Sequence, residues 1–363
     1  MEIDCQDVGK NRADTKSRPA GGRAALLFLA TAMVAGSGCI SRMAADRLIA
    51  APNADFQKNE AAWNAAWTNF LALVTTNTIV PMTVPVGPPD ATLSILEVPP
   101  GEYHRKFVSR VEQKANGRFT FSLHVETNLV NTFAQLPAPA TVLLLHGYGM
   151  MKEGMAPWAF QLAQAGYRVV AVDLRGHGHS TGNRIGFGKF ETTDLSQVLD
   201  ALRERGLCDK SVGVLGVSYG ATLALHWAAR EPRIQAVIAI APYDDPEVAF
   251  ERFARMANLP FPRRVIRRAA SSAAARLDLE WSDWSGVAAI SRLKQPVLLI
   301  TGGKDPICPP EDLQRLQAAA LGKAATFVLP DANHYVIGAS LDSLAKPIHG
   351  WLRDHLGDNP SKN

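Results

Sequence analysis

Residues 211–221 read Ser-Val-Gly-Val-Leu-Gly-Val-Ser-Tyr-Gly-Ala, and this stretch decides the fold. Its first five residues form a short apolar run typical of a buried strand, and Ala221 to Arg230 continue with a helical pattern. Between them lies Gly216-Val217-Ser218-Tyr219-Gly220, a Gly-x-Ser-x-Gly sequence in a strand–turn–helix context. The glycines permit a tight turn that holds Ser218 in a strained conformation at a helix N-terminus, where developing negative charge is stabilised. The stretch predicts that Ser218 is a nucleophile.

The same alternation of short apolar runs and helical patterns continues along the chain. Further runs occur at residues 142–145, 168–172, 235–240, 297–300 and 326–329. Such runs are typical of parallel strands buried on both faces. We therefore expect a doubly wound α/β fold, a mostly parallel sheet flanked by helices, whose ligands bind at the carboxyl ends of the strands. Before it, residues 92–98 and 103–126 predict two or three antiparallel strands, with a hairpin at Asn116-Gly117.

A serine hydroxyl needs a base to become a nucleophile, and the base needs an acid to orient it. His334 comes directly after the last apolar run, at the sheet edge to which Ser218 also points, so it is the expected base. Asp305 lies in a tight turn directly after the run at 297–300, so it is the expected acid. Asp244 or Asp245, one strand earlier, is the alternative acid.

Residues from about 140 to 355 resemble the α/β-hydrolase superfamily, most closely its monoacylglycerol-lipase-like and lysophospholipase-like serine hydrolases. The resemblance rests on the elbow around Ser218, the chain order Ser, Asp, His, His146-Gly147-Tyr148-Gly149, and the Asp-x-Arg-Gly-His-Gly-x-Ser loop at residues 173–180. It implies an oxyanion hole formed by the backbone N–H groups of Tyr148 and Tyr219. It also implies that His146, His177 and His179 are structural.

An insertion of about fifty residues between Pro242 and Gln295 is largely helical in pattern and too long for an ordinary connection. In the family, this position holds a cap or lid. Its large apolar side chains predict an apolar roof: Phe250, Phe253, Leu259, Phe261, Trp281 and Trp284. Four arginines share one side of a predicted helix: Arg263, Arg264, Arg267 and Arg268. They face either an anionic lipid surface or acidic substrate group, or simply solvent, and the solvated face is the preferred interpretation.

The N-terminus has the pattern of an export signal. Residues 10–23 carry five basic residues against one acid, and residues 24–38 form a short uncharged stretch. The following Cys39 resembles the lipidated cysteine of bacterial lipoproteins, although Gly36 stands where that pattern has an aliphatic residue. A plain cleaved signal and an uncleaved membrane anchor are the alternatives. We expect an exported protein, either anchored to a membrane through lipidated Cys39 or periplasmic or secreted.

The chain is expected to divide into four parts. These are a signal segment (1–38), an N-terminal helix with a Pro-rich linker or extended connection at Pro81 to Pro89 (39–91), an α/β-hydrolase core (92–241 and 293–357) and the cap (242–292). The helix is predicted within residues 53–75, which carry Trp63 and Trp67.

The composition of the chain argues against several classes of binding partner. The formal net charge of +4 is too small to indicate nucleic acid binding, and the four cysteines lack the spacing of a zinc site or redox motif. We expect no metal and no organic cofactor. Whether Cys208 and Cys308 pair stays open, as does the oligomeric state.

The resulting hypothesis is a serine esterase or lipase-like hydrolase that cleaves a small-molecule or lipid-like carboxylic ester through an acyl-enzyme on Ser218. An exopeptidase or amidase and a thioesterase, using the same three residues, are the alternatives within enzymes. A non-catalytic lipoprotein that keeps the fold is the alternative outside them.

Overall fold

The computed structural model describes residues 2–3, 40–54, 80–101, 103, 105–113, 119–127, 138, 140–208, 210–257 and 259–357. The predicted signal segment, apart from residues 2 and 3, lies outside this range, as do Cys39 and almost all of the predicted Trp-bearing helix. Among the described residues, no helix is both long and apolar enough to cross a bilayer.

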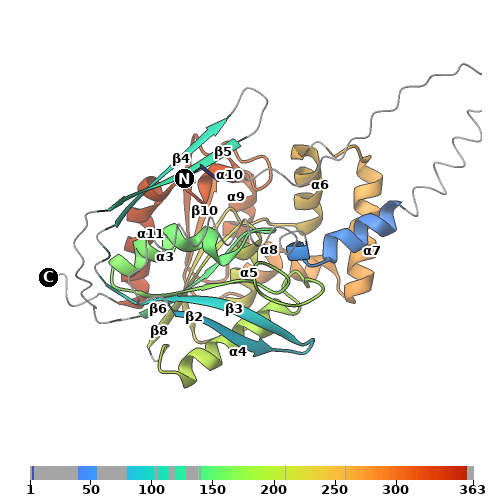
Figure 1. Ribbon diagram of the computed structural model, residues 1–363. Helices are drawn as coiled ribbons and strands as arrows, with labels where there is room; N and C mark the ends of the chain where they lie inside the picture. Colours follow the sequence, from blue (N-terminus) through green and yellow to red (C-terminus); the bar gives the residue numbers. More distant parts are fainter. Residues whose placement is uncertain are drawn as a thin grey trace, which may run out of the picture.

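An eight-stranded sheet forms the centre of the molecule (Figure 1), in the order β11-β10-β9-β8-β6-β7-β3-β2. Its strands are β2 (Val80–Val86), β3 (Ala91–Val98), β6 (Ala140–Leu145), β7 (Arg168–Val172), β8 (Ser211–Val217), β9 (Ile234–Ile240), β10 (Val297–Gly302) and β11 (Ala324–Leu329). Neighbours from β7 to β11 pair in parallel, whereas β3 is antiparallel to both β7 and β2. This confirms the predicted mostly parallel sheet, and each predicted apolar run lies in one of its strands.

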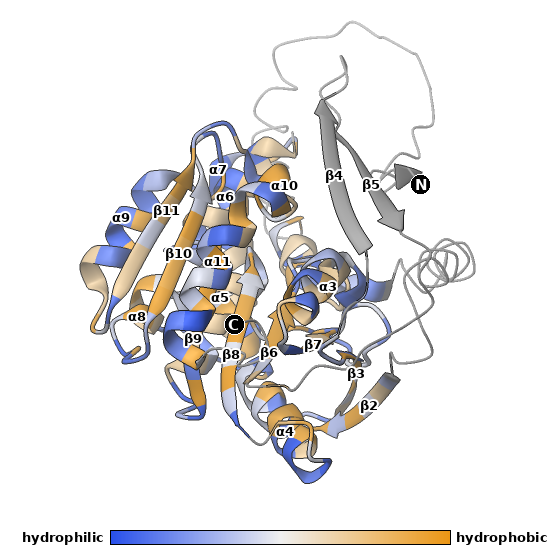
Figure 2. Cartoon of the chain, turned by 90° about the vertical axis from the view of Figure 1, so that its left-hand side faces the viewer, coloured by the Kyte–Doolittle hydropathy of each residue, from blue (hydrophilic) through white to orange (hydrophobic). Residues whose placement is uncertain are grey.

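Helices cover both faces of the sheet, and alternate side chains of each strand reach opposite cores. In β6, Val142 and Leu144 belong to the core that includes side chains of α3 (Ala156–Gln164) and α11 (Leu341–Leu356). Leu143 and Leu145 belong to the core that includes side chains of α4 (Glu191–Glu204), α5 (Tyr219–Ala228), α8 (Gly286–Ile290) and α9 (Pro310–Ala319). Burying each such side chain stabilises the fold by about 1.5–3 kcal/mol. Figure 2 shows β10 in hydrophobic colours along most of its length.

The Pro-rich stretch was predicted as a linker or extended connection; it is extended, but most of it is a strand of the core sheet rather than a linker. Residues 80–86 form β2, the edge strand, with Pro81 opposite Leu96 and Pro85 opposite Thr92. Proline cannot donate a backbone hydrogen bond, but an edge strand has one side on which no donor is needed. The core sheet therefore begins at residue 80 rather than at residue 92.

A second sheet has the order β1-β5-β4, formed by β1 (Glu2–Ile3), β4 (Arg105–Gln113) and β5 (Phe119–Thr127). The expected hairpin is present as antiparallel pairing of β4 with β5, from Arg105 opposite Thr127 to Gln113 opposite Phe119. Asn116 and Gly117 themselves lie outside the described residues.

Between β9 and β10 the chain forms the helical insertion that was predicted as a cap: α6 (Pro246–Met256), α7 (Arg263–Leu277), η4 (Trp281–Trp284) and α8. The carboxylate of Asp245 begins α6 by accepting hydrogen bonds from Glu247 N and Val248 N. A further helix, residues 40–49, lies beside α7 (Figure 1), and Arg276 donates to the carbonyl of Arg42 at 3.0 Å.

The apolar roof is only partly present. Phe250 and Trp281 pack on Phe187 of the core, with ring centroids 5.3 and 5.1 Å apart from it. The other four predicted members differ. Phe253, Leu259 and Phe261 are 45%, 45% and 39% exposed, and Trp284 lies against the Arg230 guanidinium.

All four predicted cap arginines are exposed, which agrees with a solvated helix face. Arg263 and Arg267 also both pair with Glu251 of α6, so one negative charge of the cap is shared between two of the four arginines.

Cys208 and Cys308 belong to different cores on opposite faces of the sheet, so they are not bonded to each other.

Candidate active site

Ser218 lies on the sharp turn between β8 and α5, in a left-handed backbone conformation with φ 53° and ψ −113°. Its N–H donates to Ile240 O at 2.8 Å, which fixes the turn to the neighbouring strand. A Cβ at Gly216 would lie 2.1 Å from Gly220 O, and one at Gly220 would lie 2.4 Å from Leu145 O. The two glycines of the motif are therefore required by the close approach of the turn to itself and to β6.

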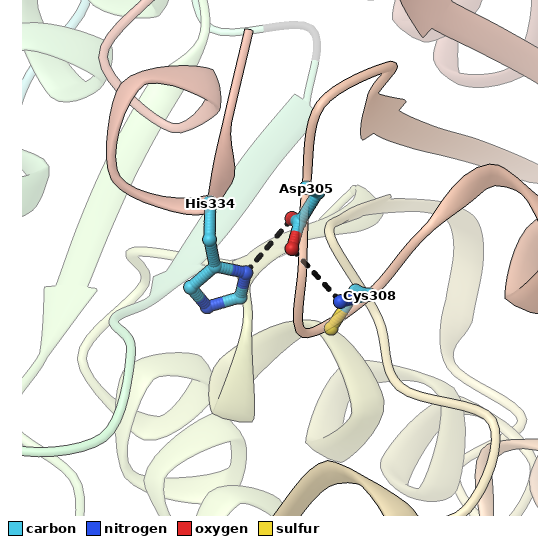
Figure 3. A group of neighbouring side chains, drawn as sticks. All are labelled: Asp305, Cys308 and His334. Carbon is cyan, nitrogen blue, oxygen red and sulfur yellow. Dashed lines mark hydrogen bonds and ion pairs between the residues drawn. The ribbon is translucent and has the colours of Figure 1, made fainter. Parts of the chain in front are cut away.

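Three predicted side chains meet in one chain of hydrogen bonds. Ser218 Oγ lies 3.0 Å from His334 Nε2. On the other side of the ring, His334 Nδ1 lies 2.8 Å from Asp305 Oδ2 (Figure 3). A neutral imidazole donates from Nδ1 to the carboxylate and accepts the serine hydroxyl at Nε2. The residues are far apart in the chain, but they follow β8, β10 and β11, whose carboxyl ends share one edge of the sheet.

His334 begins the short helix α10 (His334–Ile337), and its position is fixed from two sides. Asn333 caps the helix by accepting from Tyr335 N at 3.0 Å and Val336 N at 3.2 Å. Trp158 of α3 donates from Nε1 to Gly338 O at 2.7 Å. The imidazole is thus presented by a rigid loop rather than by a free side chain.

The carboxylate of Asp305 is fully buried and has a donor for each oxygen. Oδ2 receives His334, while Oδ1 accepts from Ile307 N and Cys308 N, both at 2.8 Å (Figure 3). A buried carboxylate requires such partners. Of the alternative acids, Asp245 caps α6 and Asp244 pairs with Arg315, so it is Asp305 that meets the imidazole.

The two predicted amides flank Ser218. Residues 147–150 form a turn closed by Met150 N donating to Gly147 O at 3.1 Å, and Tyr148 lies within this turn. A Cβ at Gly147 would stand 3.6 Å from Ser218 Cβ, so the turn lies against the serine. Tyr219 begins α5, where helix N–H groups point out toward anions. Oxyanion binding by these amides stays a prediction.

The histidines expected to be structural lie in bracing positions. His146 donates from Nδ1 to Gly147 O at 2.8 Å and accepts from Leu174 N at Nε2, and burial lowers its pKa. His177 contacts Arg175 O at 2.9 Å and stacks on Tyr219, with its pKa lowered by burial to about 3. Both rings are therefore neutral supports of the serine's surroundings.

A buried ion pair that the sequence did not reveal anchors the Tyr148 turn. Lys152, in η3 (Lys152–Met155), donates its backbone N and its Nζ to Asp173 at 2.6 and 2.7 Å, and its Nζ also pairs with Glu153 at 2.8 Å. Burial opposes the ionisation of Asp173, but a hydrogen bond from His179 and the charge of Lys152 outweigh it and lower its pKa. Asp173 directly follows the buried strand β7, so the sequence indicates that its carboxylate needs a buried partner. The sequence does not indicate that this partner is Lys152.

Two described groups could offer ligand atoms to a metal ion, since the atoms of each lie within 4.8 Å of one another: Asp305, Cys308 and His334, and Glu153, Asp173 and His179. In the second group the Lys152 ammonium already pairs with both carboxylates. In the first, Asp305 and His334 bind each other, and burial raises the pKa of the Cys308 thiol well above its ordinary value. A metal ligand must be deprotonated, which the Cys308 thiol resists. In the second group the ammonium already occupies the place of a cation, so neither of these two groups suits a metal.

Comparison with known proteins gives several matches. A family model described as "Serine aminopeptidase, S33" matches residues 137–283. The chain is 26% identical over 200 residues to the protein YqkD of Bacillus subtilis (strain 168), covering 54% of this chain and 65% of that protein. It is 33% identical over 114 residues to the thermostable monoacylglycerol lipase of Bacillus sp. (strain H-257), covering 31% of this chain and 44% of the lipase.

Solved structures show a shared fold. The Pyrococcus furiosus esterase Pf2001 superposes with a TM-score of 0.56 at 21% identity, over 77% of this chain and 93% of the esterase. The Pyrococcus horikoshii acylaminoacyl peptidase superposes with a TM-score of 0.53 at 16% identity, over 79% of this chain and 43% of the peptidase.

Proposed function

We propose that this chain, which belongs to the α/β-hydrolase superfamily of serine hydrolases, cleaves carboxylic esters through an acyl-enzyme on Ser218. The observation that carries the proposal is the hydrogen-bonded chain from Ser218 through His334 to the buried Asp305. Nucleophile, base and orienting acid are arranged as acyl transfer requires.

In the proposed reaction, Ser218 Oγ attacks the substrate carbonyl while His334 Nε2 takes its proton. Asp305 keeps the imidazole in the required tautomer and stabilises its protonated form. The N–H groups of Tyr148 and Tyr219 receive the oxyanion. His334 then protonates the departing alcohol, and in the second half it deprotonates the water that releases the acid and restores Ser218.

An ester with an apolar part is the preferred substrate, because the surface beside the reacting groups is apolar. Tyr148 and Met150 of the turn and Tyr335 next to His334 are 40%, 42% and 45% exposed. The names of two relatives, an esterase and a monoacylglycerol lipase, agree with this choice. A peptidase or amidase is the second candidate, favoured by the description of the matching family model as a serine aminopeptidase.

The test compares wild type with Ser218→Ala on p-nitrophenyl esters from acetyl to palmitoyl, on aminoacyl arylamides and on an acyl thioester. We expect ester hydrolysis that Ser218→Ala lowers by about 10⁴-fold or more. Ser271→Ala, at an exposed serine of α7, is the matched control and should leave the rate unchanged. Faster cleavage of arylamides than of esters would select the peptidase. A folded wild type that a fluorophosphonate does not label would exclude serine catalysis.

We further propose that the protein is exported and anchored to a membrane through lipidated Cys39. The proposal is supported by the basic and apolar pattern of residues 10–38. Mass analysis of the mature N-terminus should find a lipidated Cys39, and Cys39→Ser should move the protein from the membrane fraction to the soluble one. An unmodified Cys39 within an uncleaved chain would contradict it.

A further inference from the structure

The peptide unit joining Ile307 to Cys308 is held at both of its polar ends. Its N–H, from Cys308, donates to Asp305 Oδ1 at 2.8 Å (Figure 3). Its oxygen, from Ile307, accepts a hydrogen bond at 2.9 Å from Arg252 Nη1. Because a peptide unit is planar and rigid, a donor that fixes its oxygen also fixes the direction of its N–H.

Arg252 does not belong to the core that carries Asp305. It lies on α6 of the cap, which leaves the sheet after β9. Its side chain therefore bridges two parts of the molecule, and a continuous series of hydrogen bonds runs from it to the serine. The series passes through the 307–308 peptide and Asp305 to His334, and ends at Ser218 Oγ.

A buried ion pair holds Arg252 in this position. The same Nη1 donates to Asp312 Oδ2 at 2.7 Å, and the Asp312 side chain, at the start of α9, is fully buried. Arg315 donates to Asp312 Oδ1 at 2.6 Å and to Asp244 Oδ2 at 2.5 Å, where the chain leaves β9 for the cap. The arginine thus has a fixed geometry, with the Asp312 carboxyl group on one side and the peptide oxygen on the other.

We propose that Arg252 is a positioning residue that aligns Asp305 with His334 and so couples the seating of the cap to the reactivity of Ser218. The proposal rests on the proposed function for its catalytic consequence. A cap that moves away from α9 withdraws Arg252 from Ile307 O. The 307–308 peptide then loses the bond that fixes its oxygen, although Ile307 N still donates to Asp305 and Thr301 Oγ1 still donates to Cys308 O. Its N–H is then held less firmly toward Asp305, which weakens the support of the protonated imidazole.

The first experiment compares wild type with Arg252→Met, which keeps the aliphatic stem and removes the donors. We expect kcat to fall by about 10-fold to 100-fold with KM nearly unchanged, since the change misaligns reacting groups rather than removing substrate contacts. The acid limb of the pH profile of kcat should move in the direction in which Asp305→Asn moves it. Arg255→Met, at an exposed arginine of the same helix, should change neither. A less stable Arg252→Met with unchanged kcat and pH limb would overturn the proposal.

Arg252→Lys covers the case in which Arg252→Met does not fold. Both contacts of Arg252 come from one nitrogen, Nη1, and the lysine side chain is one bond shorter, so an ammonium that pairs with Asp312 is held away from Ile307 O. We expect a kcat and a pH limb between those of wild type and Asp305→Asn, and wild-type values for both would refute the proposal.

A further readout separates this proposal from that of ester hydrolysis. We expect the His334 Nδ1 proton, which lies in the 2.8 Å hydrogen bond to Asp305 Oδ2, to give a downfield NMR signal whether or not esters are cleaved. We expect it to shift or broaden in both Arg252 variants and not in Arg255→Met. An unchanged signal in the Arg252 variants would reject the positioning role, whereas the loss of ester turnover in Ser218→Ala tests only the proposed function.

Discussion

Replacing Gly220 by alanine tests whether the close packing of the serine turn sets the reaction rate. A Cβ there would lie 2.4 Å from Leu145 O and 2.6 Å from His146 O, both backbone atoms that lead into the Tyr148 turn. Ordinary contact begins at 3.4 Å, so the turn around Ser218 and the end of β6 must separate by about 1 Å. A misplacement of that size lowers the rate by about 100-fold. Overpacking should also destabilise the fold by about 1–3 kcal/mol.

The sign of the stability change distinguishes this account from a simple helix effect. Without a clash, alanine in α5 would raise stability by up to about 1 kcal/mol. Gly350→Ala in α11, where an added methyl meets nothing within 4 Å, is the matched control and should show that gain with unchanged activity. Ester kcat/KM and urea unfolding measure both effects. Gly220→Ala with wild-type kcat/KM and raised stability would refute the reasoning.

Two further predictions concern buried charges. Lys152→Met should leave the Asp173 carboxylate without its ammonium and lower the free energy of unfolding by about 3–5 kcal/mol, measured in urea; a loss below about 1 kcal/mol would show that the pair is not important. Burial lowers the pKa of His226 to about 3, so below the unfolded value of about 6.5 only the unfolded chain takes the proton. The neutral His226 therefore contributes its full stabilisation above about pH 6.5, and this stabilisation is lost as the pH falls toward 3. His226→Leu should therefore remove about 2 kcal/mol from the difference in unfolding free energy between pH 7 and pH 5, and an unchanged difference would contradict the assignment.

Much of the fold, and the proximity of Ser218, Asp305 and His334, could be predicted from the sequence. Both follow from apolar runs that are visible locally and from the rule that the carboxyl ends of parallel strands lie at one edge of the sheet. The apolar runs identify the parallel strands, and the ends of neighbouring strands meet at one edge. Ser218, Asp305 and His334 each follow a strand, so a one-dimensional pattern was enough to bring them together.

The features that were missed depend on tertiary placement. The prolines at 81 and 85 favoured a linker, and only the position of β2 at the sheet edge makes them compatible with a strand. Arg252 lies 60 residues from Asp312, and nothing in either local sequence connects them. Phe253 shows the opposite error. It was placed in the roof because it is apolar, but an apolar residue type does not guarantee burial, and its side chain is exposed.

The strained backbone of Ser218 affects which substitutions are favoured at this position during evolution. A left-handed conformation at a residue with a side chain costs about 1–3 kcal/mol, and glycine adopts it without that cost. A lineage that no longer needs the hydroxyl would therefore gain stability by replacing Ser218 with glycine. Replacement of Ser218 by glycine would raise the stability of the fold, so only the need for the hydroxyl group keeps serine at this position. A search for more stable variants that ignores activity would be drawn to this same position.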